Sequence, residues 1–448
     1  MSRTRRGRTC HRGSSRPADL IVRPEGYTLA PDGRDVYYNF VVPIPTTANR
    51  FVKGVEFLPG NPRVVHHSFI EIDRSRDARR LAEVRTPPGF YGMETPESVV
   101  MPGGQLLGWQ PGKVASFAPP GLAWVLFTNT DLVLQVHMNP SGKTETVQPS
   151  VGFHFTDEAP TNSTFRLKLT ALDLEIPPGL SNYVAEQSYE LPVDVSLTRV
   201  GAHAHYICKD MQGYAILPDG RKEWLLWIKD WDFNWQGDYG YAKPVALPKG
   251  SKVVMRYTYD NTTNNIRNPN HPPRHVRFGI QSNDEMGELY FQALPRTKED
   301  YLTLGKDYSQ YFLGVSLRHY QHLIEIDPND ARAHKRLGRV LGAQGKVDEG
   351  IAHIQKSIAL KPDEDEPHYD LASIYLRLGR MAEAFNEFRE VVRLNPRDYQ
   401  ALGSLGIISL QTGKLDEAVA YFQQALQVNP DDPIAKKYLD MVRARQGR

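Results

Sequence analysis

The sequence predicts a multidomain protein: two all-β, jelly-roll-like sandwiches followed by an all-α repeat solenoid. Up to about residue 300, short apolar runs rich in Val, Tyr, Phe and Trp alternate with clusters of Pro, Gly, Asn and Asp. After about residue 305 the pattern becomes helical and repeats. A chain of 448 residues is also too long for one ordinary hydrophobic core, so several domains are expected.

The apolar runs of the first region have the length and composition of β-strands. They are VYYNFVVPI, RVVHHSFIEI, DLVLQVHM, FRLKLTAL, EWLLWIKDW and KVVMRYTY. Turn residues separate them without helical periodicity, which favours sandwiches or jelly rolls over a parallel α/β sheet. The turn-rich stretch TDEAPTNST, Thr156 to Thr164, divides the region into domains at residues 19–158 and 163–298. Each is about 140 residues long, a usual size for such folds.

The region after residue 305 repeats with a period of 34 residues. The period is marked by Pro328, Pro362, Pro396 and Pro430, and by Gly345, Gly379 and Gly413. This interval is typical of tetratricopeptide repeats, whose helix pairs end at such glycines and prolines. Three repeats between Ala331 and Pro430, a preceding helix near Tyr311 to Ile326 and a closing helix from Pro433 form a predicted domain at residues 306–448. We expect this domain to bind a protein or peptide partner; the alternative is a structural dock for the β region.

Composition excludes several classes of function. A hydrophobic fraction of 40% and a charged fraction of 24% are typical of globular proteins, and no apolar run approaches the roughly 18 residues that a membrane span requires. The net charge of +2 gives no reason to expect nucleic acid as a partner. With only Cys10 and Cys208, a disulfide framework or thiolate cluster is excluded. Any metal site must therefore use His, Met or carboxylates.

The start of the chain differs from the rest. Its first 16 residues carry six arginines, no acidic residue and no apolar stretch of the kind found in secretory signals. We expect a disordered basic leader over residues 1–18, either a solvated segment or the start of a truncated reading frame.

Adjacent histidines in RVVHHSFIEID raise a geometric question. Neighbouring side chains on a regular strand point to opposite faces, so His66 and His67 can reach one point only if the strand ends or bulges there. The alternative is a pair at a strand edge with one ring in solvent.

A second pair has a different spacing. His203 and His205, in TRVGAHAHYICKDM, are two residues apart. On a strand they therefore lie on the same face, where both can bind one metal ion. Such a pair also occurs on solvent faces and in cupins, but a cupin needs a glutamate a few residues on, where only Asp210 is near. His137, in DLVLQVHMNPSG, and Met286, in QSNDEMGELYF, are further donors; packing is the alternative role for Met286.

The ordered series of these residues resembles a known family. His66-His67, Gln-Val-His137, His203-x-His205 and Asp-Glu-Met286 are similar to the copper type II ascorbate-dependent monooxygenases, which include the peptidylglycine α-hydroxylating and dopamine β-monooxygenases. The resemblance covers about residues 35 to 295 and includes DVYYNFVVPIP, EFLPGNPRVVHH and GWQPG. It is greatest to bacterial members that carry tetratricopeptide repeats.

The resemblance implies two copper ions per chain, one in each sandwich, with a solvent-filled cleft between them. It assigns an electron-storing copper to His66, His67 and His137, and the catalytic copper that binds dioxygen to His203, His205 and Met286. Ascorbate or another one-electron reductant is the implied cosubstrate. Imidazole suits copper in both oxidation states and a thioether favours Cu(I), whereas zinc, the main competitor, rarely recruits methionine.

The substrate pocket of the family is less well matched. Tyr290 and Gln135 correspond to family positions, and we expect them to contact the substrate. Gly201 replaces an arginine that binds the substrate carboxylate in the peptide-amidating member, while Glu288 and Gly287 replace asparagine and cysteine. Peptide amidation is therefore not expected, and the substrate is an unspecified small molecule or peptide.

Together these patterns predict a copper-dependent monooxygenase that hydroxylates a C–H bond. The alternatives are a non-catalytic copper-binding protein and a tetratricopeptide protein-interaction scaffold. Copper chemistry favours the periplasm or the cell exterior, although the chain carries no recognisable signal peptide.

Overall fold

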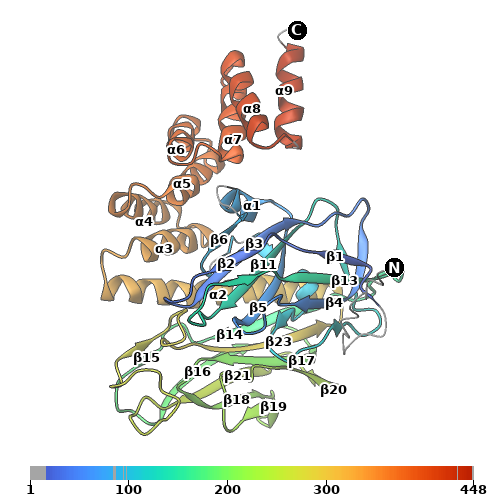
Figure 1. The fold of residues 1–448 in the computed structure, drawn as a ribbon, viewed down its shortest axis with the longest axis vertical. Coiled ribbons are helices and arrows are strands. Elements are labelled where there is room, and N and C mark those ends of the chain that lie inside the picture. Colours follow the sequence, from blue (N-terminus) through green and yellow to red (C-terminus); the bar gives the residue numbers. More distant parts are fainter. Residues whose placement is uncertain (1–16, 84–86, 94, 97, 431, 446–448) are drawn as a thin grey trace, which may run out of the picture. The chain divides into compact units, whose positions relative to one another are not determined.

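The computed structural model describes residues 17–83, 87–93, 95–96, 98–430 and 432–445. The chain forms two compact units, Met1–Tyr308 and Ser309–Arg448. Strands predominate in the first unit and helices make up the second (Figure 1), and the helix Lys298–Ile326 belongs partly to each. The predicted basic leader lies outside the described residues as far as residue 16. Among the helices that can be described, none combines the length and apolar character needed to cross a membrane.

The first half of the β unit contains two main antiparallel sheets. One has the order β1 (Leu20–Val22), β13 (Ser150–Thr156), β4 (Arg50–Leu58), β10 (Trp124–Leu126), with β9 (Ser116–Phe117) paired to β4. The other has the order β6 (Gly89–Tyr91), β3 (Val36–Pro43), β11 (Asp131–Met138), β5 (Val65–Asp73), β7 (Val99–Val100), with β8 (Gly108–Trp109) paired to β5. A small sheet pairs β2 (Tyr27–Leu29) with β12 (Glu145–Val147), and two short helices, α1 (Asp77–Ala82) and η1 (Pro102–Gly104), lie between strands.

The second half repeats this plan with its own sheets. One has the order β14 (Phe165–Thr170), β23 (Gly287–Pro295), β17 (Val195–Ala204), β20 (Asp238–Leu247). The other has the order β16 (Tyr183–Glu190), β21 (Lys252–Tyr259), β18 (Cys208–Ile216), β19 (Lys222–Ile228), and β15 (Glu175–Ile176) pairs with β22 (Val276–Arg277). The six predicted runs coincide with β3, β5, β11, β14, β19 and β21, so the predicted all-β region is confirmed, and its strands form open antiparallel sheets.

Strand β11 shows how the core positions a histidine. All eight of its residues are buried, which is possible because both of its faces are covered. Leu134 and Val136 belong to the core packed between the two sheets, together with Phe153 of the opposite sheet. Side chains alternate along a strand, so Gln135 and His137 lie on the face away from that core.

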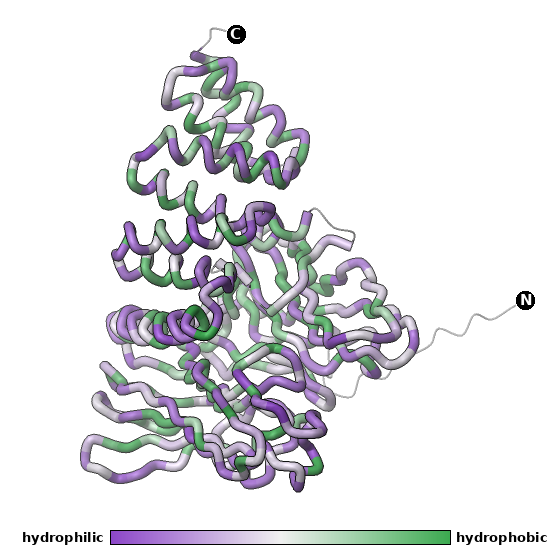
Figure 2. The backbone as a smooth tube through the Cα atoms, turned by 90° about the vertical axis from the view of Figure 1, so that its left-hand side faces the viewer, coloured by the Kyte–Doolittle hydropathy of each residue, from purple (hydrophilic) through white to green (hydrophobic). Residues whose placement is uncertain are grey.

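The second unit is a helical solenoid. After α2 (Lys298–Ile326) come α3 (Ala331–Ala343), α4 (Val347–Leu360), α5 (Asp365–Arg377), α6 (Met381–Leu394), α7 (Tyr399–Gln411), α8 (Leu415–Val428) and α9 (Pro433–Arg445). Hydrophilic and hydrophobic residues alternate along these helices (Figure 2), as expected when one face of each packs inward. Gly345, Gly379 and Gly413 have positive φ angles and end α3, α5 and α7, as the repeat pattern predicts.

The helix before the repeats is longer than predicted. It begins at Lys298 rather than near Tyr311, so the boundary placed at residue 306 falls inside α2. The sequence signal for this start is a reciprocal cap: the Asp300 N–H donates to Thr297 Oγ1, and the Thr297 N–H donates to the Asp300 carboxylate.

Candidate metal centre

A β-bulge in β5 brings the adjacent histidines together. In the pairing of β5 with β11, His67 lies opposite His137 and the next pair is Val65 with Met138, so His66 has no partner in the ladder. An extra residue in one strand turns its neighbours away from strict alternation. As a result the His66 and His67 Nδ1 atoms are 3.0 Å apart, although the two residues are consecutive.

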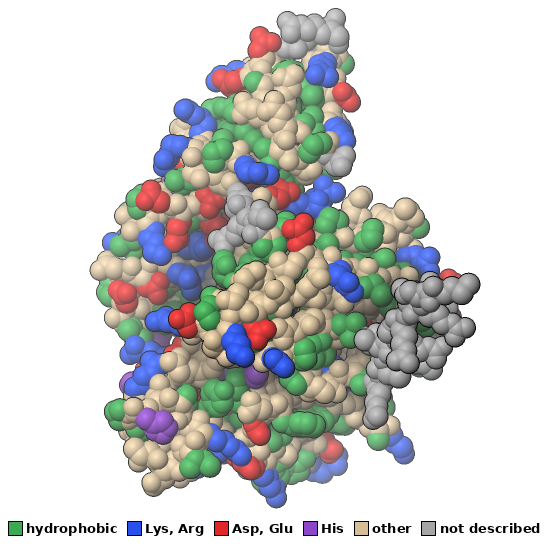
Figure 3. All heavy atoms as spheres, in the orientation of Figure 1, with side chains coloured by type: hydrophobic (Ala, Val, Ile, Leu, Met, Phe, Trp, Pro, Cys, Tyr) green, Lys and Arg blue, Asp and Glu red, His purple; other side chains and the backbone are tan. Residues whose placement is uncertain are grey.

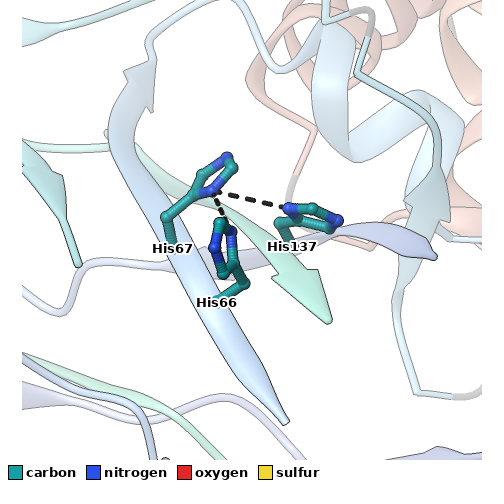
Figure 4. Close-up of side chains that lie close together, drawn as sticks. All are labelled: His66, His67 and His137. Atoms are coloured by element: carbon teal, nitrogen blue, oxygen red, sulfur yellow. Dashed lines mark hydrogen bonds between the residues drawn. The ribbon is translucent and has the colours of Figure 1, made fainter. Parts of the chain in front are cut away.

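His137 completes a three-imidazole cluster with this pair. Its Nδ1 lies 3.4 Å from His67 Nδ1, and the three possible ligand atoms all lie within 4.8 Å of one another. Figure 4 shows the three rings turned toward a common point. Burial, followed by the neighbouring His137 and His203, lowers the pKa of His66 to about 3, and burial lowers the pKa of His67 as well. These two rings are therefore neutral at pH 7, the form that a metal ion needs.

The far nitrogen of His137 also has a partner. Its Nε2 lies 3.2 Å from Asp35 Oδ2, and the Asp35 carboxylate accepts a 2.8 Å hydrogen bond from Asn139 Nδ2. The His137 ring stacks on Tyr37, with centroids 4.1 Å apart and planes 8° apart. Histidines that bind metal usually give their second nitrogen to a carboxylate or carbonyl, which fixes the ring orientation. His137 has a carboxylate at ion-pair distance on this side, although its Nε2 makes no hydrogen bond among the described residues, and its Nδ1 is left for a ligand.

The second histidine pair presents the opposite nitrogens. His203 lies near the end of β17, and its Nδ1 donates to Gln236 Oε1. His205 follows the strand, and its Nδ1 donates to the Asp284 backbone oxygen at 3.3 Å. Its Nε2 is buried and has no hydrogen-bond partner among the described residues. Since Nδ1 is occupied in both rings, Nε2 is the nitrogen available to a metal ion.

Glu285 ties the backbone of Met286 to the backbone around His205. The backbone N–H groups of His205 and Met286 both donate to Glu285 Oε1, and the Ile207 N–H donates to Oε2 at 3.1 Å. In the ladder of β17 and β23, Ala204 lies opposite Gly287, so the next pair outward would be His205 and Met286. Met286 is 2% exposed. Burial raises the pKa of Glu285 to about 8, although backbone hydrogen bonds oppose the rise.

The two histidine sets lie side by side. The rings of His67 and His203 have centroids 5.7 Å apart, and His66 stacks on Phe233 with centroids 4.4 Å apart. The solvent-filled cleft implied by the family resemblance does not separate them; a cavity of about 30 Å³ is lined by both His67 and His203. Direct bonds between the halves account for this closeness. They are Lys113 to Asp238, Gln292 to Gln105 and Ser282 to Asp35.

The expected substrate-contacting residues have different surroundings. Tyr290 lies opposite Gly201 in the ladder, and a Cβ at Gly201 would be 2.2 Å from the Tyr290 ring. The tyrosine therefore fills the space that a side chain at position 201 would need, while lining the small cavity beside His203. The Gln135 side chain donates to Asn39 Oδ1 at 3.0 Å and to the Met93 oxygen at 3.1 Å. Its amide hydrogens are thus directed to protein acceptors.

Sequence reasoning missed the residues that orient the histidines. Asp35, Gln236 and Glu285 were given no role, and Phe233 was not considered. Glu285 directly precedes Met286, and Asp35 begins the run DVYYNF. Both carboxylates therefore lie in segments that carry the family resemblance, and this was the available sequence signal for them. Gln236 lies in a loop without a recognisable motif.

Comparison with known proteins identifies the helical region. Residues 369–433 match the tetratricopeptide repeat family. Two crystal structures of MamA are similar to this chain at 20% identity, each over 32% of the chain, covering 83% and 78% of the MamA chains with TM-scores of 0.30 and 0.29. No curated protein matches. These TM-scores are too low to carry an argument, but the family match confirms the predicted repeats, and such repeats imply protein partners.

Proposed function

We propose that the β unit is a copper-dependent monooxygenase and that the helical unit recruits a protein partner. The proposed reaction hydroxylates a C–H bond of a small molecule or peptide, using dioxygen and ascorbate or another one-electron reductant. In this proposal the two open-sheet halves are jelly-roll-like sandwiches. One observation carries the enzymatic part: five histidines cluster, four of them are buried, and in three of the rings a neighbour lies at one nitrogen and leaves the other for a metal ion.

The two donor sets fit copper better than zinc. The first offers three Nδ1 atoms from His66, His67 and His137. The second would use the Nε2 atoms of His203 and His205 together with the thioether of Met286, which continues the ladder opposite His205. A set of imidazoles alone serves both copper oxidation states, whereas a thioether favours Cu(I) and is rarely used by zinc. Copper bound at these sets would supply one-electron transfer and dioxygen reduction.

The protein itself orients the imidazole rings and excludes bulk water from the second histidine set. Asp35, Gln236 and the Asp284 carbonyl each hold one imidazole, so the rings do not need to reorient when a metal ion binds. Contact between the His67 and His203 rings gives electrons a short path between the sets. Burial of His205 keeps bulk water away from the donors assigned to oxygen chemistry.

Oxygen uptake distinguishes an enzyme from a copper-binding protein. Copper-loaded protein with ascorbate should consume oxygen in proportion to hydroxylated product, and His205→Ala should abolish this uptake while the first set still holds copper. Arg221→Gln, at an exposed ion pair with Asp219, is the control and should retain full uptake. Uptake that is equal in wild type and His205→Ala would contradict the enzymatic proposal.

The second candidate function is that of a tetratricopeptide interaction scaffold whose β unit binds copper without turnover. The repeat match over residues 369–433 favours it, whereas the enzymatic case depends on the histidine geometry alone. Ion pairs between successive repeats, Lys335 with Glu366 and Arg339 with Asp370, show that α3 and α5 present charged side chains beside one another. Affinity capture with the full chain, with and without copper, followed by mass spectrometry would test this role. Identical partners in both states, without ascorbate-driven uptake, would favour the scaffold.

A further inference from the structure

A cavity outside the histidine cluster has the size of a small-molecule site. Its volume is about 360 Å³, within the roughly 300–1,000 Å³ range of ligand pockets. Two segments form it, residues 110–117 from the first half of the β unit and residues 235–239 from the second, together with Arg199 of β17.

The charged part of its wall has an excess of positive charge. Lys113 and Arg199 both bind Asp238, so two cations share one carboxylate. The exposed fractions of their side chains are 13% for Lys113 and 24% for Arg199. No other Asp, Glu, Lys, Arg or His is among the described residues that line the cavity. A partly desolvated cation without a matching anion is unfavourable, so this wall favours an anionic ligand.

Apart from the polar side chains of Gln110, Ser116 and Gln236, the rest of the wall is largely apolar and open to solvent. Val114, Phe117, Trp235 and Tyr239 line it, and the Trp235 side chain is 70% exposed. Exposed aromatic side chains around a cavity bury the apolar part of a ligand and stack on it. Together with the cations, they fit a molecule that has an apolar body and one carboxylate.

Shared residues connect this cavity to the candidate metal centre. Gln110, Gln236 and Asp238 line both it and the small cavity that reaches His67 and His203. Gln236 is also the hydrogen-bond partner of His203. A ligand in the larger cavity is therefore separated from the second histidine set by a single layer of side chains.

We propose that this cavity binds a small carboxylate with an aromatic or branched apolar body, and that this molecule is the substrate class of the chain. Its role as a substrate rests on the proposed function. In the bound state the carboxylate pairs with Lys113 and Arg199, and the apolar body packs against Trp235 and Phe117.

Calorimetric titration of the full-length, metal-free protein tests the binding. The probes are 4-phenylbutyrate, its neutral analogue 4-phenylbutanamide, and ascorbate, an anion without an apolar body. Hydrogen bonds to a charged partner contribute about 1.5–3 kcal/mol, so we expect 4-phenylbutyrate to bind about tenfold or more tightly than the amide. Equal affinities for these two compounds overturn the proposal. If ascorbate binds as tightly as 4-phenylbutyrate, the cavity is assigned to the reductant. This result also overturns the proposal.

Two variants separate the charged and apolar contributions. Arg199→Gln leaves Lys113 and Asp238 as a neutral pair, and should bring the affinity for 4-phenylbutyrate down to that of the amide. Trp235→Ala, which truncates a side chain that is 70% exposed, should weaken the binding of both compounds by the same factor. Arg221→Gln removes an exposed arginine elsewhere and should change neither. An effect of Arg199→Gln no larger than that of Arg221→Gln contradicts the assignment.

Failure of this inference can be told apart from failure of the proposed function. The titration uses metal-free protein and measures binding alone, so it needs neither copper nor turnover. None of its variants substitutes a residue of the proposed metal sets. Oxygen uptake stimulated by ascorbate but not by any carboxylate, with no carboxylate binding, rejects the cavity assignment alone. Carboxylate binding without oxygen uptake in copper-loaded protein rejects the enzymatic function.

Discussion

The two histidine sets of the β unit hold their rings by opposite nitrogens. In the first set the Nδ1 atoms converge, and Asp35 lies at the far Nε2 of His137. In the second set Gln236 and the Asp284 carbonyl occupy Nδ1, which leaves Nε2 of His203 and His205. Because Nδ1 is bonded to the ring carbon that carries the side-chain stem and Nε2 lies on the far side of the ring, the first set would hold an ion nearer its own backbone than the second. The same residue type thus makes two different sites.

The largest expected effect is the loss of one ion. Copper-reconstituted wild-type protein should hold two ions per chain, and His67→Ala should hold one, because it removes the central Nδ1 of the first set. His205→Ala should likewise leave one ion, at the first set. Metal analysis with electron paramagnetic resonance gives the count and the surviving site. Loss of both ions from either variant would show one shared site across the 5.7 Å ring contact and would break the comparison.

The donor atom at Met286 gives the second prediction. Met286→His should keep the second copper bound but shift it toward Cu(II), because an imidazole replaces a soft thioether. X-ray absorption of the reduced protein should show a copper–sulfur contribution in the wild type and none in the variant. If the wild-type spectrum lacks sulfur, Met286 is a packing residue and the oxygen chemistry assigned to the second set loses its support.

Glu285 gives the third prediction, which concerns stability and one site together. Glu285→Ala removes the acceptor of the backbone N–H groups of His205, Ile207 and Met286 and leaves them buried without a partner, whichever protonation state Glu285 has. An unsatisfied buried group costs about 1–3 kcal/mol, so the free energy of unfolding should fall by this amount in denaturant titrations. Copper at the second set should weaken while the first set is unchanged. An equal loss at both sets would mean that the effect is global unfolding.

The smallest expected effects come from the partners of the rings. Asp35→Asn should lower copper affinity at the first set, and Gln236→Leu should lower it at the second, each by about 10–100-fold. Competition with a copper chelator, read separately for each site, measures both. Since the two variants serve as controls for each other, identical changes at both sites would contradict the separate orientation of the rings.

The sequence was most informative where a pattern repeats or alternates. A period of 34 residues predicted the helix pairs because each repeat has to satisfy the same packing. Apolar runs predicted strands such as β11, Asp131–Met138, to the residue, since both faces of this strand are buried. The start of α2 was missed because its cap depends on Thr297 and Asp300, a signal that is local and easily passed over.

The candidate site was only partly predictable, for a physical reason. Donor types can be recognised in a sequence, and a regular strand places His203 and His205 on one face. Whether His66 and His67 converge depends on the bulge, and the sequence of two adjacent histidines does not determine whether the strand bulges there. The partners Asp35 and Gln236 reach the rings through tertiary contacts 102 and 33 residues apart in the chain, and no spacing rule connects them.

The bulge at His66 also makes the first histidine set separable from the fold. Because His66 is the residue left over in the ladder, a chain lacking it could pair β5 with β11 in unbroken register on both sides of the gap. Such a one-residue deletion would remove a ligand while making the strand more regular, and irregular backbone is commonly kept for function at some expense of stability. Homologues that no longer bind a metal ion could therefore gain stability by deleting this one residue. Homologues that keep the extra residue would be those in which the site is still used.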